Sequence, residues 1–170
     1  AKSAGRMHVI TTAIEHHAVL EPVEALVGRG FDATILPVNE QGWATPEDLA
    51  AALRPDTVLV STMHANNETG IIQPIDDIAS IAKDKNILFH TDAAQTYGKE
   101  IAALENEDID MISFSGHKIY GPKGIGGLIL RRNKEMLINP LQLGGGQERG
   151  MRPGTLAVHL IAGLGKASEL

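Results

Sequence analysis

A single lysine, Lys118, stands in a sequence context that gives it unusual chemical potential. It follows an apolar segment, residues 110–114, that we expect to form a buried strand, and a turn at residues 121–124 comes after it. Burying a lysine ammonium is costly unless its proton leaves or a partner approaches. A partly desolvated amine at the end of a strand can therefore form a Schiff base with a carbonyl group. The alternative is an exposed lysine in a Gly/Pro-rich loop, where most lysines lie.

Polar side chains follow four of the predicted strands at the point where each strand ends. Because the carboxyl ends of parallel strands meet at one edge of a sheet, where ligands bind, we expect these side chains to converge. They are Glu15, His16 and His17; His64, Asn66, Asn67 and Glu68; Asp92 and Gln95; and Ser115, His117 and Lys118. Their convergence favours a site at this edge over an isolated surface loop.

Asp92 and the His16-His17 pair have side chains that a pyridine-containing carbonyl cofactor would need. An amine that forms an imine needs an electron sink, and in pyridoxal phosphate the sink is a pyridine ring whose nitrogen is held by a carboxylate. Asp92 could be that carboxylate, although an aspartate after a strand is often a helix N-cap. Either histidine could stack on the ring, whereas such a pair can also be a solvated loop or an adventitious metal site.

Amide and hydroxyl side chains at the same edge would complete such a site. Asn67 and Gln95 could form hydrogen bonds with the ring oxygen, and Ser115 and His117 are placed to donate to a phosphate group. Each has a local alternative, because Asn-Asn pairs often mark turns and short polar side chains often cap nearby backbone groups. Together these residues indicate pyridoxal phosphate chemistry anchored on Lys118.

Other classes of site find little support in the sequence. The seven histidines form no H-E-x-x-H pattern and the chain has no cysteine, so we expect no metal site, disulfide or thiol nucleophile in it. Residues 121–126 match neither a Walker loop nor a G-x-G-x-x-G motif between a strand and a helix. The net charge of −6 and the scattered basic residues argue against nucleic-acid binding.

The apolar pattern predicts a single α/β domain with a mostly parallel sheet. We expect no membrane span and no signal peptide, and we expect a cytoplasmic protein. The strands are predicted at residues 8–12, 31–38, 57–62, 87–90, 110–114 and 125–130, the last as a hairpin return. The helices are predicted at residues 19–27, 45–53, 74–82 and 155–164, with Thr45 and Thr155 as N-caps. Alternating strands and helices of this length are typical of βαβ units.

Five segments of the sequence resemble the cysteine desulfurases of fold-type I, the aminotransferase-like pyridoxal phosphate enzymes. They are IEHHAVL (14–20), MHANNETG (63–70), HTDAAQ (90–95), SFSGHKIYGPKG (113–124) and GGGQERGMRPGT (144–155), in the family's order. The resemblance implies a three-layer sandwich like the large domain of aspartate aminotransferase. It also implies conversion of L-cysteine to L-alanine, with the sulfur passed as a persulfide to an acceptor such as an iron–sulfur scaffold protein.

The same resemblance implies a role for each candidate residue. It makes Lys118 the Schiff-base lysine, acting in catalysis with His16, which stacks on the ring. It makes Thr155 a ligand of the phosphate in the neighbouring subunit's site, and so implies a homodimer. The remaining cofactor ligands that it implies are Asp92 at the pyridine nitrogen, Asn67 and Gln95 near the ring hydroxyl, and Ser115 and His117 near the phosphate.

The chain also departs from the family pattern. In the family, a cysteine on a mobile loop beyond the matched segments accepts the sulfur, and a phosphate-binding loop precedes the position of Ala1. We therefore expect residues 1–170 to be the truncated core of the cofactor-binding large domain, without the small domain or the catalytic-cysteine loop, and inactive alone. Two alternatives stay open: a selenocysteine lyase or related pyridoxal phosphate lyase, and a catalytically silent fragment or scaffold.

Overall fold

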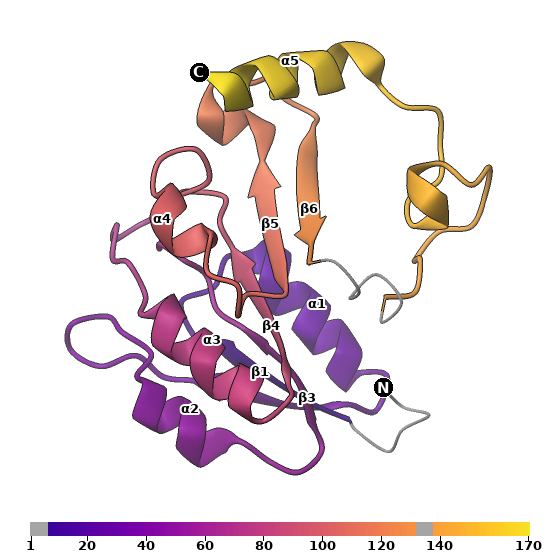
Figure 1. Ribbon diagram of the computed structural model, residues 1–170. Coiled ribbons are helices and arrows are strands. Elements are labelled where there is room, and N and C mark those ends of the chain that lie inside the picture. Colours follow the sequence, from indigo (N-terminus) through magenta and orange to yellow (C-terminus); the bar gives the residue numbers. More distant parts are fainter. Residues whose placement is uncertain (1–6, 132–137) are drawn as a thin grey trace.

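A six-stranded sheet forms the centre of the computed structural model, which describes residues 7–131 and 138–170 (Figure 1). The strand order is β2-β1-β3-β4-β5-β6, and every neighbouring pair is parallel except β5 and β6. This arrangement confirms the predicted α/β fold with a mostly parallel sheet. The strands are β1 (His8–Thr12), β2 (Asp32–Leu36), β3 (Thr57–Ser61), β4 (Leu88–Asp92), β5 (Met111–Ser115) and β6 (Gly126–Leu130).

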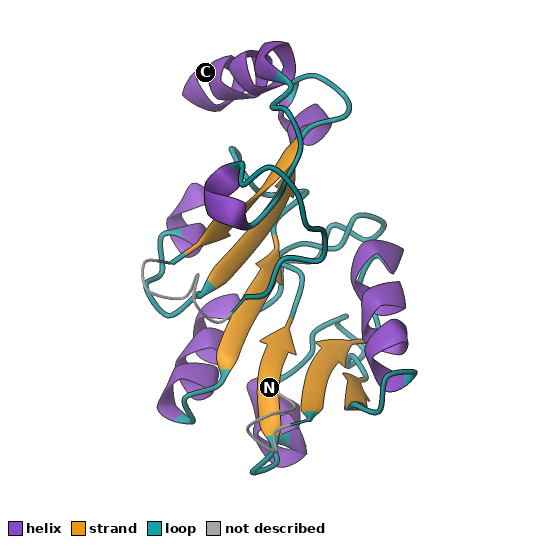
Figure 2. Cartoon of the chain, turned by 90° about the vertical axis from the view of Figure 1, so that its right-hand side faces the viewer, coloured by secondary structure: helices purple, strands orange, loops and turns teal. Residues whose placement is uncertain are grey.

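Helices lie on both faces of the sheet, so the fold has three layers (Figure 2). Helices α2 and α3 pack against each other on one face, and α1 lies on the other. None of the described helices is long and apolar enough to cross a membrane. The helices are α1 (His17–Val27), α2 (Pro46–Ala52), α3 (Ile75–Asp84), α4 (Ile101–Leu104) and α5 (Val158–Glu169), with 3₁₀ turns η2 (Gly116–Ile119) and η4 (Glu148–Gly150).

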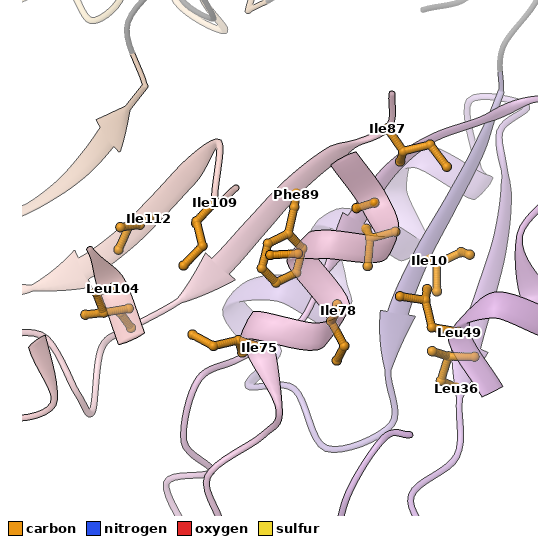
Figure 3. Close-up of a cluster of buried hydrophobic side chains, with 14 residues drawn as sticks. Ile10, Leu36, Leu49, Ile75, Ile78, Ile87, Phe89, Leu104, Ile109 and Ile112 are labelled. Atoms are coloured by element: carbon orange, nitrogen blue, oxygen red, sulfur yellow. The ribbon is translucent and has the colours of Figure 1, made fainter. Parts of the chain in front are cut away.

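The hydrophobic core fills the space between the sheet and helices α2 and α3 (Figure 3). Phe89 of β4 is fully buried, and its neighbours His90 and Leu88 point to the opposite face, as alternation along a strand requires. The α3 residues that are buried follow helical spacing. They are Ile75, Ile78, Ala79 and Ala82. Ile81 is partly buried and packs against the same core.

Of two predicted helix starts, the structure confirms one and contradicts the other. Thr45 caps α2 as predicted, because its hydroxyl oxygen accepts from the backbone N–H of Asp48 at 3.1 Å. Thr155 does not cap the last helix, so that prediction was wrong. The first backbone bonds of α5 go to the carbonyl of Ala157, which is the N-cap residue. The helix therefore begins at Val158 rather than near Leu156.

The predicted hairpin return is confirmed, since β6 runs antiparallel to β5 with Ser115 opposite Gly126. The two strands approach so closely that a Cβ atom on Gly126 would lie 2.6 Å from the carbonyl oxygen of Phe114. The connection passes through η2, which carries Lys118, and through Tyr120, whose φ of 65° ends the 3₁₀ turn. The hairpin thus fixes the segment that holds the lysine against the end of β5.

Candidate active site

A pocket of about 540 Å³ lies where β4 and β5 end and α1 begins. It is on the face of the sheet opposite the hydrophobic core, at the carboxyl ends of the parallel strands, where α/β folds bind ligands. Seven of the eight predicted site residues line it, and Thr155 does not. The lining residues are His16, Ala18, Val19, Met63, Ala65, Asn67, His90, Asp92, Ala94, Gln95, Ser113, Phe114, Ser115, His117 and Lys118.

The structure distinguishes between the two adjacent histidines. His16 is the N-cap of α1, where its Nδ1 accepts from the backbone N–H of Ala18 at 3.1 Å, and its side chain lines the pocket. His17 is already helical, not part of the preceding loop as the sequence suggested. Its ring lies 4.0 Å from the carboxylate of Glu21, one turn along α1. His16 is therefore the histidine that can cover a planar ligand.

Asp92 ends β4 and presents a buried carboxylate to the pocket. Its Oδ1 accepts from the backbone N–H of Ala94 at 2.8 Å and so holds a turn, not the helix N-terminus that the sequence left as an alternative. The other carboxylate oxygen has no hydrogen bond within the described residues. The side chain thus stabilises the turn after β4 and still offers one oxygen to a ligand.

The Asn66-Asn67 pair divides two tasks between its members. Asn66 holds the turn: its Oδ1 accepts from the backbone N–H groups of Glu68 and Thr69, and its Nδ2 donates to the carbonyl of Ile14. Asn67 lines the pocket. The turn-forming role that Asn-Asn pairs often have therefore belongs to Asn66, which leaves Asn67 available to a ligand.

Lys118 reaches the pocket from η2, directly after β5. Its side chain is half-buried: it is less exposed than a lysine in a surface loop, but it is not fully removed from water. Ser115 and His117 line the same wall. Phe114 adds an apolar surface, and its ring stacks on Tyr97 with the ring centroids 4.0 Å apart. An amine, a hydroxyl and an imidazole thus share one end of the pocket.

His90 is a pocket residue that the sequence reasoning missed. Its Nδ1 lies 2.8 Å from the Ser61 hydroxyl and its Nε2 lies 3.1 Å from the Ser113 hydroxyl, so both ring nitrogens have partners. Burial lowers the pKa of His90, although the charge of Asp92 opposes this effect. His90 stands two residues before Asp92 in β4, and this period-2 spacing on one strand could have placed both side chains on one face.

Besides His17, Asn66 and Glu68, the predicted polar-edge residues His64 and Glu15 do not line the pocket. The His64 ring is buried, its Nδ1 lies 2.8 Å from the Thr96 hydroxyl, and burial lowers its pKa. Glu15 is also buried and bonds to the backbone of Met63. Both residues are part of the support behind the pocket wall.

Thr155 lies in a separate shallow depression formed by residues 142–155. The role that the family resemblance implies for it is at another subunit's site, so that role stays a prediction. Among the described residues, no group of three or more His, Cys, Asp or Glu side chains is placed to hold a metal ion.

Comparison with known proteins identifies close relatives. The aminotransferase class-V family model matches residues 2–170. The mitochondrial cysteine desulfurase of Saccharomyces cerevisiae is 51% identical over 165 residues, which are 97% of this chain and 33% of that protein. The crystal structure of DndA from Streptomyces lividans superposes with a TM-score of 0.93 at 51% identity, over 99% of this chain and 48% of that chain.

A second similar structure is that of SspA in complex with cysteine. It has a TM-score of 0.90 and 45% identity, and the match covers 97% of this chain and 48% of that chain. The chain therefore spans between about a third and a half of the length of these proteins.

Proposed function

Because the chain belongs to the aminotransferase class-V family, we propose that the complete protein is a pyridoxal phosphate-dependent cysteine desulfurase. In this proposal it converts L-cysteine to L-alanine and passes the sulfur on as a persulfide. The observation that carries the proposal is the pocket in which Lys118, Asp92 and His16 meet from three separate segments of the chain. The identity of about 50% to named desulfurases supports the same reaction. The 170 residues would form the core of the cofactor-binding domain.

The residues present fit pyridoxal phosphate. The unpartnered carboxylate oxygen of Asp92 suits a protonated ring nitrogen, because it is an anionic acceptor that would otherwise remain without a hydrogen bond. The amides of Asn67 and Gln95 would bind the ring hydroxyl, and Ser115 and His117 would donate to the phosphate. When bound, the cofactor supplies the electron sink that makes removal of the substrate Cα proton feasible.

Lys118 would perform two tasks in sequence. Its Nζ would hold the cofactor covalently, and once the substrate amine has displaced it, the same Nζ would take the proton from Cα. The half-buried position of Lys118 suits both tasks, since its side chain reaches the pocket from η2 while the backbone is held at the end of β5. Asp92 would keep the proton on the ring nitrogen, and His16 would cover one face of the ring and exclude water.

The sulfur step needs a thiolate that these 170 residues do not contain, because the chain has no cysteine. We place that thiolate outside this segment in the complete protein, from which a sulfur-acceptor protein, such as an iron–sulfur scaffold, would receive the persulfide. We propose cysteine as the substrate, and the complex of a similar protein with cysteine supports this choice, while selenocysteine stays the alternative. Alanine formation from each amino acid, measured side by side, tests this preference.

Reduction of the complete protein with borohydride, followed by peptide mass mapping, tests the role of Lys118. We expect a pyridoxyl adduct on Lys118 alone, and none on Lys118→Ala. The exposed Lys123 nearby is the matched control, so Lys123→Ala should retain the adduct on Lys118. An adduct on another lysine, or on none, would contradict the proposal.

We further propose a homodimer in which Thr155 serves the partner's site. Thr155 lies outside the pocket of its own chain, and the exposed apolar side chains of Leu141 and Leu143 lie in the same segment. A cytoplasmic location stays a prediction, since one relative is named as mitochondrial. Sedimentation of the complete protein tests the dimer.

A further inference from the structure

Glu15 is a buried carboxyl group to which the proposed reaction gives no task. It lies in the loop between β1 and α1, and only 6% of it is exposed. Its Oε1 accepts from the backbone N–H of Met63 at 2.7 Å and from the Thr12 hydroxyl at 2.8 Å. Its Oε2 is buried and has no hydrogen-bond partner among the described residues. Burying a carboxyl oxygen without a hydrogen-bond partner costs free energy of folding, so such a group is expected to have a specific role.

The bond between Glu15 and Met63 joins two walls of the pocket. Met63 lines the pocket after β3, and His16, the residue next to Glu15, lines it at the start of α1. The same two segments are joined a second time, because Asn66 Nδ2 donates to the carbonyl of Ile14 at 2.9 Å. These two hydrogen bonds, Met63 to Glu15 and Asn66 to Ile14, therefore fix the position of the His16 wall relative to the Met63 wall.

The charge of Glu15 is sensitive to its surroundings. Burial raises its pKa to about 7, while the hydrogen bonds from Met63 and Thr12 favour the carboxylate and the charge of Asp92 disfavours it. Asp92 is the only charged residue among those described that shifts this pKa. Because Asp92 also lines the pocket, the ionisation of Glu15 and the charge of a ligand at Asp92 influence each other.

We propose that Glu15 is a positioning residue that sets the spacing between the His16 and Met63 walls of the pocket, and that its negative charge favours a cationic ring at Asp92. This inference rests on the proposed function. The hydrogen bond from the Met63 N–H to Glu15 fixes the turn before α1 in the position from which the His16 ring covers a planar ligand. When Glu15 ionises, the potential at Asp92 becomes more negative, and a protonated ring nitrogen is held more firmly.

Two variants of the complete protein separate the contact from the charge. Glu15→Ala removes the acceptor for the Met63 N–H, whereas Glu15→Gln retains an oxygen acceptor and removes only the charge. Glu21→Gln is the matched control, since Glu21 is an exposed glutamate on α1. The dissociation constant of pyridoxal 5'-phosphate is measured from pH 6 to 8, together with the visible circular dichroism of the bound cofactor.

We expect Glu15→Ala to raise the dissociation constant about tenfold and to change the visible circular dichroism, because the position of His16 shifts. For Glu15→Gln, the dissociation constant relative to the unmodified protein should be unchanged at pH 6 and about threefold higher at pH 8. Comparing the two proteins at each pH cancels the ionisation of the cofactor itself. The control should match the unmodified protein throughout.

If the ratio of the Glu15→Gln dissociation constant to that of the unmodified protein stays constant with pH, the role of the charge is overturned. This comparison holds even where Glu15→Ala fails to fold. Unchanged affinity and circular dichroism in a folded Glu15→Ala variant, even one with a lower melting temperature, would overturn the positioning role. If the unmodified protein binds no pyridoxal phosphate and Lys118 carries no adduct, the proposed function itself fails, and this inference fails with it.

Discussion

Asp92 shows how one side chain can meet a structural and a chemical demand together. One carboxylate oxygen holds the turn after β4 through the N–H of Ala94, and the other is left for the pocket. The Asn66-Asn67 pair achieves the same division with two residues, of which only Asn67 lines the pocket. In both cases the residue that organises the turn also fixes where the pocket-lining group lies.

Replacing Asp92 with asparagine separates these two demands. Asparagine retains an oxygen that accepts from the Ala94 N–H, so the fold should be preserved, but it cannot act as an anion toward a ring nitrogen. We expect alanine formation by the complete protein to fall at least about a hundredfold, with a melting temperature close to that of the unmodified protein. Asp77→Asn, at an exposed position of α3, should retain full activity. Full activity in Asp92→Asn would rule out this role.

Glu15 should make the stability of the protein depend on pH. An unfolded glutamate ionises near pH 4.5, whereas in the folded protein the pKa is about 7, so the folded state binds more protons between these values. The free energy of unfolding should therefore fall as pH rises through this window and level off above about pH 7. Each pKa unit corresponds to about 1.4 kcal/mol, so the loss is up to about 3 kcal/mol.

Urea denaturation at pH 5 and pH 8 measures this loss. We expect the unmodified protein to lose about 2 to 3 kcal/mol more than Glu15→Gln between the two pH values, because glutamine does not titrate. Glu21→Gln should behave like the unmodified protein. Equal pH dependence in Glu15→Gln and the unmodified protein would show that Glu15 ionises normally.

At the scale of elements, strand register places a row of polar side chains that runs from β3 into the pocket. Ser61 of β3 pairs with His90 of β4, and Ser113 of β5 pairs with Asp92 of β4. The ring of His90 bridges the two serine hydroxyls, so the row crosses three strands and ends beside Asp92. Parallel pairing thus converts residues distant in the sequence into one hydrogen-bonded unit.

Ser61→Ala should weaken the hydrogen-bonded row of Ser61, His90 and Ser113. Ser61 does not line the pocket, so the substitution leaves the pocket lining unchanged. The variant leaves the buried Nδ1 of His90 without its partner, which costs about 1 to 3 kcal/mol of unfolding free energy. Urea denaturation measures the loss, and Ser80→Ala, at an exposed position of α3, is the control. A loss no larger than that of the control would show that water or another group replaces the serine.

At the scale of the whole molecule, the sequence predicted the sheet and most of the site because periodicity and position after a strand are local signals. Lys118 and Asp92 follow strands directly, and Thr45 has the N-cap pattern. The functions of Glu15 and His90 depend on partners 48 and 29 residues away, Met63 and Ser61, which no local pattern specifies. The predicted start of α5 was wrong for a related reason. Threonine is a common N-cap residue type, but the backbone hydrogen bonds of the folded chain make Ala157 the N-cap residue.

Subunit complementation can test whether two copies of the complete protein share their sites. If Thr155 serves the partner's site, then Lys118→Ala and Thr155→Ala subunits should complement each other. In a mixed dimer, one site would carry both substitutions, and the other would combine an intact Lys118 with an intact Thr155. Differently tagged subunits allow the mixed dimer to be purified after co-expression. We expect it to recover about half of the activity of the unmodified dimer, because symmetry gives two equivalent sites.

The two parent homodimers are the controls for this experiment. Lys118→Ala should be inactive, and Thr155→Ala should be impaired by weaker phosphate binding. If each chain used its own Thr155, no site of the mixed dimer would be intact, and its activity would not exceed half that of the Thr155→Ala homodimer. The position of Thr155 outside the pocket of its own chain makes complementation the expected result.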